Sequence, residues 1–115
     1  MVKRGARYVV VMITCDKRDE AREIARALVR ARAAACVSVY PKGESFYWWK
    51  GSMETAREHL LLAKTSLAGL PRLVEAVKKL HSYEVPEIVA IPLVGGSGEY
   101  LTWLSEELCG KRSRR

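Results

Sequence analysis

The side chains that could bind a metal or react as nucleophiles are few and widely spaced. The 115-residue chain has three cysteines and two histidines: Cys15, Cys36, Cys109, His59 and His81. Thiolate is a ligand that suits Cu(I), and imidazole suits Cu(II) and zinc. No two cysteines form a Cys-x-x-Cys pair, which argues against a structural zinc site and a thioredoxin-type redox motif. Because three cysteines do not make a disulfide framework, we expect free thiols and a cytoplasmic protein.

The net charge of +7 comes from the two ends of the chain. Seven basic residues within 3–7 and 111–115 equal the whole excess, so residues 8–110 are neutral. This distribution predicts basic, solvated tails, which bind polyanions at most weakly, rather than a surface that recognises phosphates. No apolar run approaches the roughly 18 residues that a membrane helix needs. We therefore expect no specific nucleic-acid partner and no membrane partner.

The elements that must position these residues follow from the periodicity of apolar side chains. It predicts one domain at residues 8–108, between a basic tail at 1–7 and another at 109–115. Strands are expected at 8–14, 35–40, 45–50 and 87–94, and a run at 57–65 fits either a strand or a helix. Helices are expected at about 19–31, 70–80 and 100–108. This order is that of a ferredoxin-like α+β fold with an extra C-terminal helix, in which both central helices cover one face of an antiparallel sheet.

Three local signals refine these boundaries. Asp16 or Asp19 is a candidate cap for the first helix. Pro41 and Gly43 are expected to stop the second strand. Pro92 is expected only at an edge or a bulge of the sheet, since proline has no N–H to donate.

Four consecutive aromatic residues occupy the third predicted strand. Side chains alternate across a strand, so Phe46 and Trp48 point to one side while Tyr47 and Trp49 point to the other. If one pair packs under the helices, the other pair faces outward as an apolar patch. Burial of this patch predicts self-association, because each buried aromatic side chain contributes roughly 1.5–3 kcal/mol.

Five segments in order resemble the CutA divalent-ion tolerance family over about residues 8–108. They are Ala-Ala-Cys-Val at 34–37, Ser-Phe-Tyr-Trp-Trp-Lys-Gly at 45–51, Glu58 with Lys64-Thr65, His-Ser-Tyr-Glu-Val-Pro-Glu at 81–87, and Tyr-Leu-Thr-Trp-Leu at 100–104. In the fourth segment Ser82 replaces the usual proline. The resemblance implies a homotrimer with strands paired across subunit boundaries, and we expect Tyr47, Trp49 and Tyr83 at the trimer interface. It also implies copper or other divalent-cation binding and no enzymatic activity.

The resemblance also identifies candidate metal ligands. Cys15 matches a cysteine that binds copper in some relatives, and His81 matches the loop histidine of the family. Cys36 is a weaker candidate. The alternatives are structural: a semi-buried thiol for Cys15, a hydrogen-bonded histidine for His81 and a small core residue for Cys36. Helping carboxylates could come from Asp16, Glu84 and Glu87, with Cu(II), Cu(I) or another divalent cation as the ligand and no obligatory cofactor.

Other function classes have weaker support. A sensor that resembles the PII signalling trimers, with small-molecule sites between subunits, remains the alternative, although Gly95–Gly98 lacks the spacing of a phosphate-binding loop. An RNA-binding ferredoxin-like domain needs an aromatic RNP1-type strand that this chain lacks. The chain has no Asn and no Gln, which are thermally labile residues, so we expect a thermostable protein.

Overall fold

The computed structural model describes residues 7–110. Most of the two basic tails predicted at 1–7 and 109–115 therefore lies outside the described residues. The elements follow one another as β1 (Tyr8–Cys15), α1 (Arg18–Arg30), β2 (Cys36–Trp49), β3 (Ser52–Ser66), α2 (Leu70–Leu80), β4 (Ile88–Pro92) and α3 (Gly98–Leu108). None of the described helices is long and apolar enough to cross a membrane.

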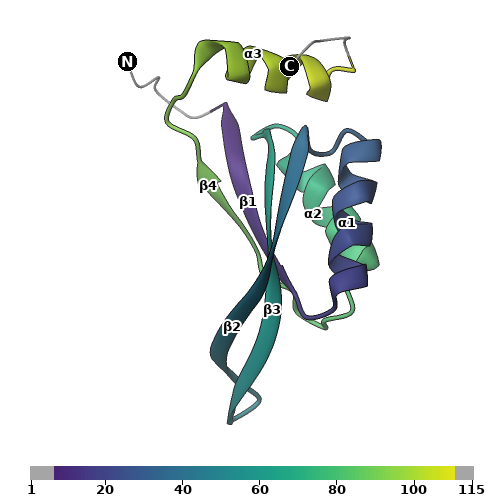
Figure 1. Ribbon diagram of the computed structural model, residues 1–115, viewed down its shortest axis with the longest axis vertical. Coiled ribbons are helices and arrows are strands. Elements are labelled where there is room, and N and C mark those ends of the chain that lie inside the picture. The colour runs from purple at the N-terminus through teal and green to yellow at the C-terminus, as the bar shows by residue number, and fades with distance from the viewer. Residues whose placement is uncertain (1–6, 111–115) are drawn as a thin grey trace.

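The four strands form one antiparallel sheet in the order β2-β3-β1-β4. Helices α1 and α2 cover one face of this sheet, and α3 lies across one end of it (Figure 1). The arrangement confirms the predicted ferredoxin-like α+β fold with an additional C-terminal helix. Pro92 lies on β4 at the edge of the sheet, as the sequence predicts.

The core lies between the helices and the alternate side chains of the two central strands. Val9, Val11 and Ile13 of β1 are buried on the helix side, because side chains alternate along a strand. Helix α1 contributes Ala21, Ile24 and Leu28, which recur at helical spacing on one face. The remaining large members of the core are Leu61, Leu73 and Val77. Cys15, the last residue of β1, is buried on the same face as Val9, Val11 and Ile13.

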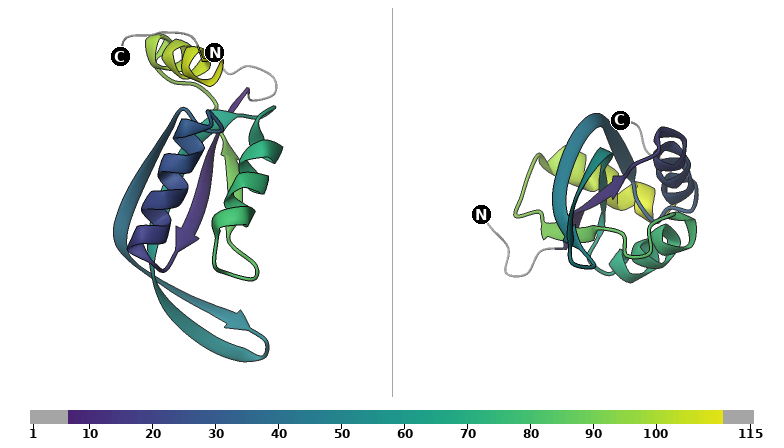
Figure 2. Two further views of the ribbon diagram at one scale, coloured as in Figure 1. Left: turned by 90° about the vertical axis from the view of Figure 1, so that its right-hand side faces the viewer. Right: turned by 90° about the horizontal axis from the view of Figure 1, so that it is seen from below.

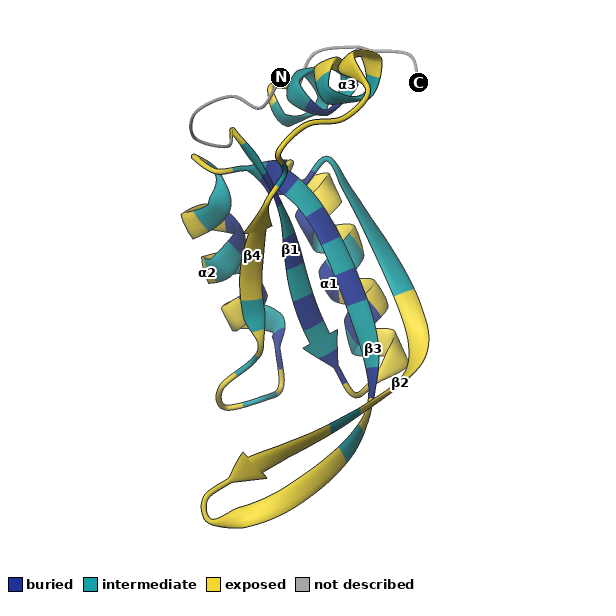
Figure 3. Cartoon of the chain, turned by 90° about the vertical axis from the view of Figure 1, so that its left-hand side faces the viewer, coloured by how far each residue is buried: buried dark blue, intermediate teal, exposed yellow. Residues whose placement is uncertain are grey.

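The opposite face of the sheet is also largely apolar; α1 and α2 do not cover it, and α3 lies only across one end. The register places Val10 and Met12 of β1 beside Ile91 and Val89 of β4. On β3, Leu62 pairs with Met12, Lys64 pairs with Val10, and Leu60 lies on the same face opposite Thr14. Figure 3 shows this face with α1 and α2 behind the sheet. Val89 and Ile91 are exposed. We call the six residues Val10, Met12, Leu60, Leu62, Val89 and Ile91 the outer apolar face.

Strand β2 corrects the sequence prediction of two separate strands. It runs without a break from Cys36 to Trp49, and its register against β3 shifts between Tyr40 and Gly43. Pro41 is tolerated there because β2 is an edge strand. Lys42 takes a positive φ of 67° at the irregularity. The predicted stop at Pro41 and Gly43 is therefore a β-bulge rather than a chain reversal.

Two other boundaries differ from the sequence prediction, and the structure decides the run that fitted either a strand or a helix. The N-cap of α1 is Lys17, whose side chain makes no capping hydrogen bond, so the predicted cap by Asp16 or Asp19 is wrong. Asp19 lies instead in the first turn, where a negative charge interacts favourably with the helix dipole. Residues 57–65 belong to a strand, because β3 pairs on both sides. Strand β4 is shorter than the predicted 87–94.

The far halves of β2 and β3 project as a hairpin beyond the helices (Figures 1 and 3). Lys50 and Gly51 both have positive φ at its tip, which is the geometry of a type I′ turn. Neither aromatic pair packs under the helices, contrary to that sequence expectation, because the hairpin extends past them. Phe46 and Trp48 are 66% and 74% exposed, and Tyr47 and Trp49 are 39% and 37% exposed.

Candidate metal centre and the neighbouring pocket

A thiol, a carboxylate and an imidazole lie together at the end of β1, the start of α1 and the end of α2. Cys15 is the last residue of β1, Glu20 lies in the first turn of α1, and His81 is the C-cap of α2. The ligating atoms of these three residues all lie within 4.8 Å of one another. Within residues 7–110 this is the one group of three or more such side chains that could hold a metal ion. We call it the Cys15–Glu20–His81 cluster.

Cys15 carries a protonated thiol. Its Sγ donates to Glu20 Oε2 at 3.1 Å and lies 3.6 Å from the carbonyl oxygen of Lys17. Burial and the hydrogen bond to Glu20 raise the pKa of the Cys15 thiol to about 12. The thiolate is therefore scarce near neutral pH unless a cation stabilises it.

Glu20 accepts three hydrogen bonds through one oxygen. Besides the thiol, Ser82 donates its backbone N–H at 3.2 Å and its hydroxyl at 3.0 Å to Glu20 Oε2. Burial favours the neutral acid, but the hydrogen bonds from Cys15 and Ser82 outweigh it and hold the pKa of Glu20 below its usual value. The segment at 81–87 resembles a family motif that usually has proline at position 82. Proline has no N–H and no hydroxyl, so it could donate neither bond.

His81 is held through both ring nitrogens. Its side chain is fully buried, with Nε2 at 2.6 Å from the carbonyl oxygen of Thr14. Nε2 therefore carries the proton, and Nδ1 accepts the backbone N–H of Tyr83 at 3.1 Å. Nδ1 also lies 3.7 Å from Glu20 Oε2. The structural alternative for His81 thus has direct support, and a metal would replace the Tyr83 N–H at Nδ1.

Cys36 does not join the cluster. Its Sγ lies 3.3 Å from the hydroxyl of Tyr100 and 3.8 Å from Lys64 Nζ. Burial, together with the hydrogen bond to Cys36, raises the pKa of Tyr100. Cys109, on which the sequence placed no role, is exposed.

The predicted helper carboxylates lie elsewhere. Asp16 is exposed, Glu84 forms an ion pair with Lys50 at 3.6 Å, and Glu87 accepts a hydrogen bond from the Thr14 hydroxyl at 3.3 Å. Glu20 takes their place in the cluster, and sequence reasoning missed it. The available signal was its position in the first turn of α1, five residues after Cys15.

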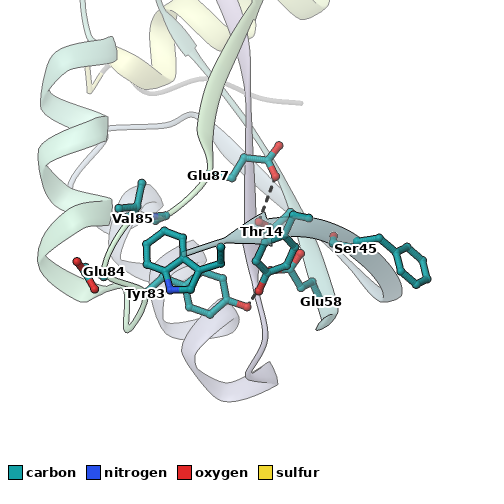
Figure 4. Close-up of a pocket in the computed structure, with 11 residues that line it drawn as sticks. Thr14, Ser45, Glu58, Tyr83, Glu84, Val85 and Glu87 are labelled. Carbon is teal, nitrogen blue, oxygen red and sulfur yellow. Dashed lines mark hydrogen bonds between the residues drawn. The ribbon is translucent and has the colours of Figure 1, made fainter. Parts of the chain in front are cut away.

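A pocket of about 700 Å³ opens between the base of the hairpin and the segment after α2. Tyr47, Trp49 and Tyr83, the three residues predicted at the trimer interface, all line it. Figure 4 shows Tyr83 bonded to Glu58, whose Oε2 accepts the Tyr83 hydroxyl at 2.8 Å. Burial and this bond raise the pKa of Tyr83. Glu84 and Glu87 also line the pocket, so it combines aromatic rings with carboxylates.

The donor set of the Cys15–Glu20–His81 cluster fits a borderline or soft cation. Thiolate, imidazole and carboxylate are ligands of zinc, and thiolate and imidazole are ligands of copper. Mg²⁺ prefers an all-oxygen site, which this cluster does not offer. The proton on Cys15 opposes binding, since it must leave before the sulfur can ligate.

Three comparisons show what the chain is similar to. The family model described as "CutA1 divalent ion tolerance protein" matches residues 9–107. The divalent-cation tolerance protein CutA of Thermus thermophilus is 50% identical over 97 residues, which are 84% of this chain and 94% of that protein. The chloroplastic CutA 1 protein of Oryza sativa is 41% identical over 96 residues, and the chain spans only 54% of its length. The crystal structure of CutA from Xylella fastidiosa superimposes with a TM-score of 0.87 at 36% identity, over 90% of this chain and 99% of that chain.

Proposed function

This chain belongs to the CutA1 divalent ion tolerance family, and from that premise we propose that it binds a copper-like or zinc-like cation without catalysing a reaction. The observation that carries the proposal is the convergence of Cys15, Glu20 and His81 within 4.8 Å. The names of the family and of the relatives support a role in tolerance of divalent cations. Cys36 plays no part in the proposed site, because its sulfur contacts Tyr100 and Lys64 instead.

Each residue of the cluster has a distinct part in the proposed binding. Cys15 releases its proton and supplies a thiolate. Glu20 supplies a carboxylate that is already charged, because its hydrogen bonds hold its pKa low. His81 supplies Nδ1, and its bond to the Thr14 carbonyl orients the ring. The bound cation contributes a positive charge that stabilises the thiolate.

Calorimetric titration of the metal-free protein with Zn(II), Cu(II) and Mg(II) tests the proposal. We expect Zn(II) and Cu(II) to bind at one ion per chain, and Mg(II) to give no heat. Cys15→Ser and Glu20→Gln should each weaken Zn(II) binding by about tenfold or more, since the site has only three donors.

The matched control is Cys36→Ser, which removes a half-buried thiol outside the cluster. Its affinity for Zn(II) should equal that of the unchanged protein. Equal losses from Cys15→Ser and Cys36→Ser, or no heat from any of the three ions at 0.1 mM protein, would refute the assignment. The affinity should also rise with pH, because ligation by Cys15 releases a proton.

The proposal includes a homotrimer. The outer apolar face and the exposed hairpin aromatics support it, because contiguous apolar surface that neither α1 nor α2 covers is typical of an interface. A cytoplasmic location is part of the proposal, supported by the three free thiols within residues 7–110. Thermostability is a further part, supported by the absence of Asn and Gln.

A PII-like small-molecule sensor is the second candidate, and the pocket of about 700 Å³ is the observation that favours it. Rings from Tyr47, Trp49 and Tyr83 beside three carboxylates would suit a ligand with a positive charge. A thermal-shift panel of nucleotides and organic amines tests this candidate. A ligand at 100 times its dissociation constant adds about 2.7 kcal/mol of stability, which such an assay detects.

A further inference from the structure

A second hollow, distinct from the metal cluster and the aromatic pocket, lies between α1 and the edge strand β2. It has a volume of about 380 Å³. Figure 2 shows α1 beside β2 along this side of the molecule. The polar residues that line it are Arg18, Arg22, Arg26 and His59, and the rest of the lining is apolar. No residue of the Cys15–Glu20–His81 cluster belongs to it.

The three arginines belong to one side of α1. They recur at every fourth residue, so their side chains follow one stripe of the helix, and the first and last Cα atoms are about 12 Å apart. None of the three forms an ion pair with a carboxylate of residues 7–110. Three exposed guanidinium groups of one helix therefore line one side of the hollow, and none of them is held by an ion pair within residues 7–110.

His59 adds an unsatisfied polar group at the same place. It lies on β3, opposite Cys15 in the register, and its Nδ1 is buried with no hydrogen-bond partner among the described residues. Buried imidazole nitrogens normally have a partner. Pro41 reaches the lining of the hollow from the β-bulge in β2. The bulge, the histidine and the arginine stripe thus converge on one concave site.

We propose that this hollow is a binding site for an anion of the diphosphate class. Guanidinium groups bind phosphate oxygens through two parallel hydrogen bonds, a geometry that a lysine cannot provide. Three such groups, spread over about 12 Å of helix, suit two linked phosphates better than a single one. The apolar lining, which includes Ala25 and Val39, contacts the remainder of a phosphorylated small molecule.

Calorimetric titration of the full chain with pyrophosphate, inorganic phosphate and citrate tests the proposal. Pyrophosphate should bind about tenfold or more tightly than inorganic phosphate, because it reaches more than one arginine. Replacing the stripe with Arg18→Gln, Arg22→Gln and Arg26→Gln together should weaken pyrophosphate binding by at least about tenfold. Arg22→Lys alone, which keeps the charge and removes the forked donor, should weaken it by about threefold to tenfold.

The matched control removes three positive charges outside the arginine stripe: Lys50→Gln, Lys78→Gln and Lys79→Gln. It retains both basic tails, and its affinity for pyrophosphate should change less than about twofold. Equal losses in the two triple variants would show a general charge effect and overturn the site. Citrate binding as tight as pyrophosphate binding would overturn the phosphate class, and absence of heat with pyrophosphate would overturn the proposal altogether.

Discussion

Cys15 keeps its proton because burial and the neighbouring Glu20 carboxylate both disfavour the thiolate. The folded chain therefore holds this proton more strongly than the unfolded chain does. Below pH about 9 both states are protonated, and the contribution of the thiol to stability is complete. Between pH about 9 and about 12 only the unfolded state ionises, so this contribution is lost as the pH rises.

The replacement of Cys15 by alanine should show this dependence. The difference in free energy of unfolding between the unchanged protein and Cys15→Ala should shrink by up to about 1.4 kcal/mol per pH unit above pH 9, in the metal-free protein. Urea unfolding at several pH values between 8 and 11 measures it. Cys109→Ala changes an exposed cysteine and serves as the control. A difference for Cys15→Ala that grows with pH would contradict the protonated thiol.

At the scale of elements, the bulge in β2 depends on a close approach of two backbones. Gly43 pairs with Glu58 just after the register shift. A Cβ atom at position 43 would lie 2.9 Å from the carbonyl oxygen of Glu58, which is too close for any side chain. Glu58 in turn accepts the hydroxyl of Tyr83 in the aromatic pocket. The bulge therefore connects the edge of the sheet to the position of a pocket residue.

Gly43→Ala should destabilise the fold by about 1–3 kcal/mol, because the added methyl group forces the two strands apart. Gly95→Ala is the matched control, since nothing lies within 4 Å of a Cβ at that position. Its effect should stay within about 0.5 kcal/mol. Chemical denaturation of both variants measures the difference. Equal stabilities for the two variants would contradict the close approach.

At the scale of the whole molecule, one subunit leaves both the outer apolar face and the hairpin aromatics uncovered. Helices α1 and α2 cover the other face of the sheet, and the hairpin extends past them (Figures 1 and 3). Each apolar side chain that an interface removes from water contributes roughly 1.5–3 kcal/mol. Burial of several such residues per chain would favour assembly, which is the physical basis of the proposed trimer.

Sedimentation at micromolar concentration should give a particle of three times the 12.9 kDa chain mass. Ile91→Glu, which introduces a charge on the outer apolar face, should shift the particle toward the monomer, because a buried unpaired charge is costly. Val29→Glu introduces the same charge at an exposed position of α1, and it should leave the trimer intact. A stable particle of a single chain mass would refute the trimer.

Much of the fold could be predicted because it depends on local patterns. The alternation at Tyr8–Cys15 and the helical spacing of Ala21, Ile24 and Leu28 require only neighbouring residues. The β-bulge at Pro41 was missed because proline and glycine give similar signals for a bulge and for a turn. Only the pairing partner on β3 distinguishes the two.

The sequence by itself determined the ferredoxin-like order of elements, the family motifs and two of the three cluster residues, Cys15 and His81. Tertiary structure alone decided that Glu20 joins them and that Cys36 does not. It also brought His59 to the arginine stripe of α1, since these groups lie far apart along the chain. The physical reason is that hydrogen bonds and burial act over a few ångströms in space. Sequence periodicity records only the face of an element on which a residue lies.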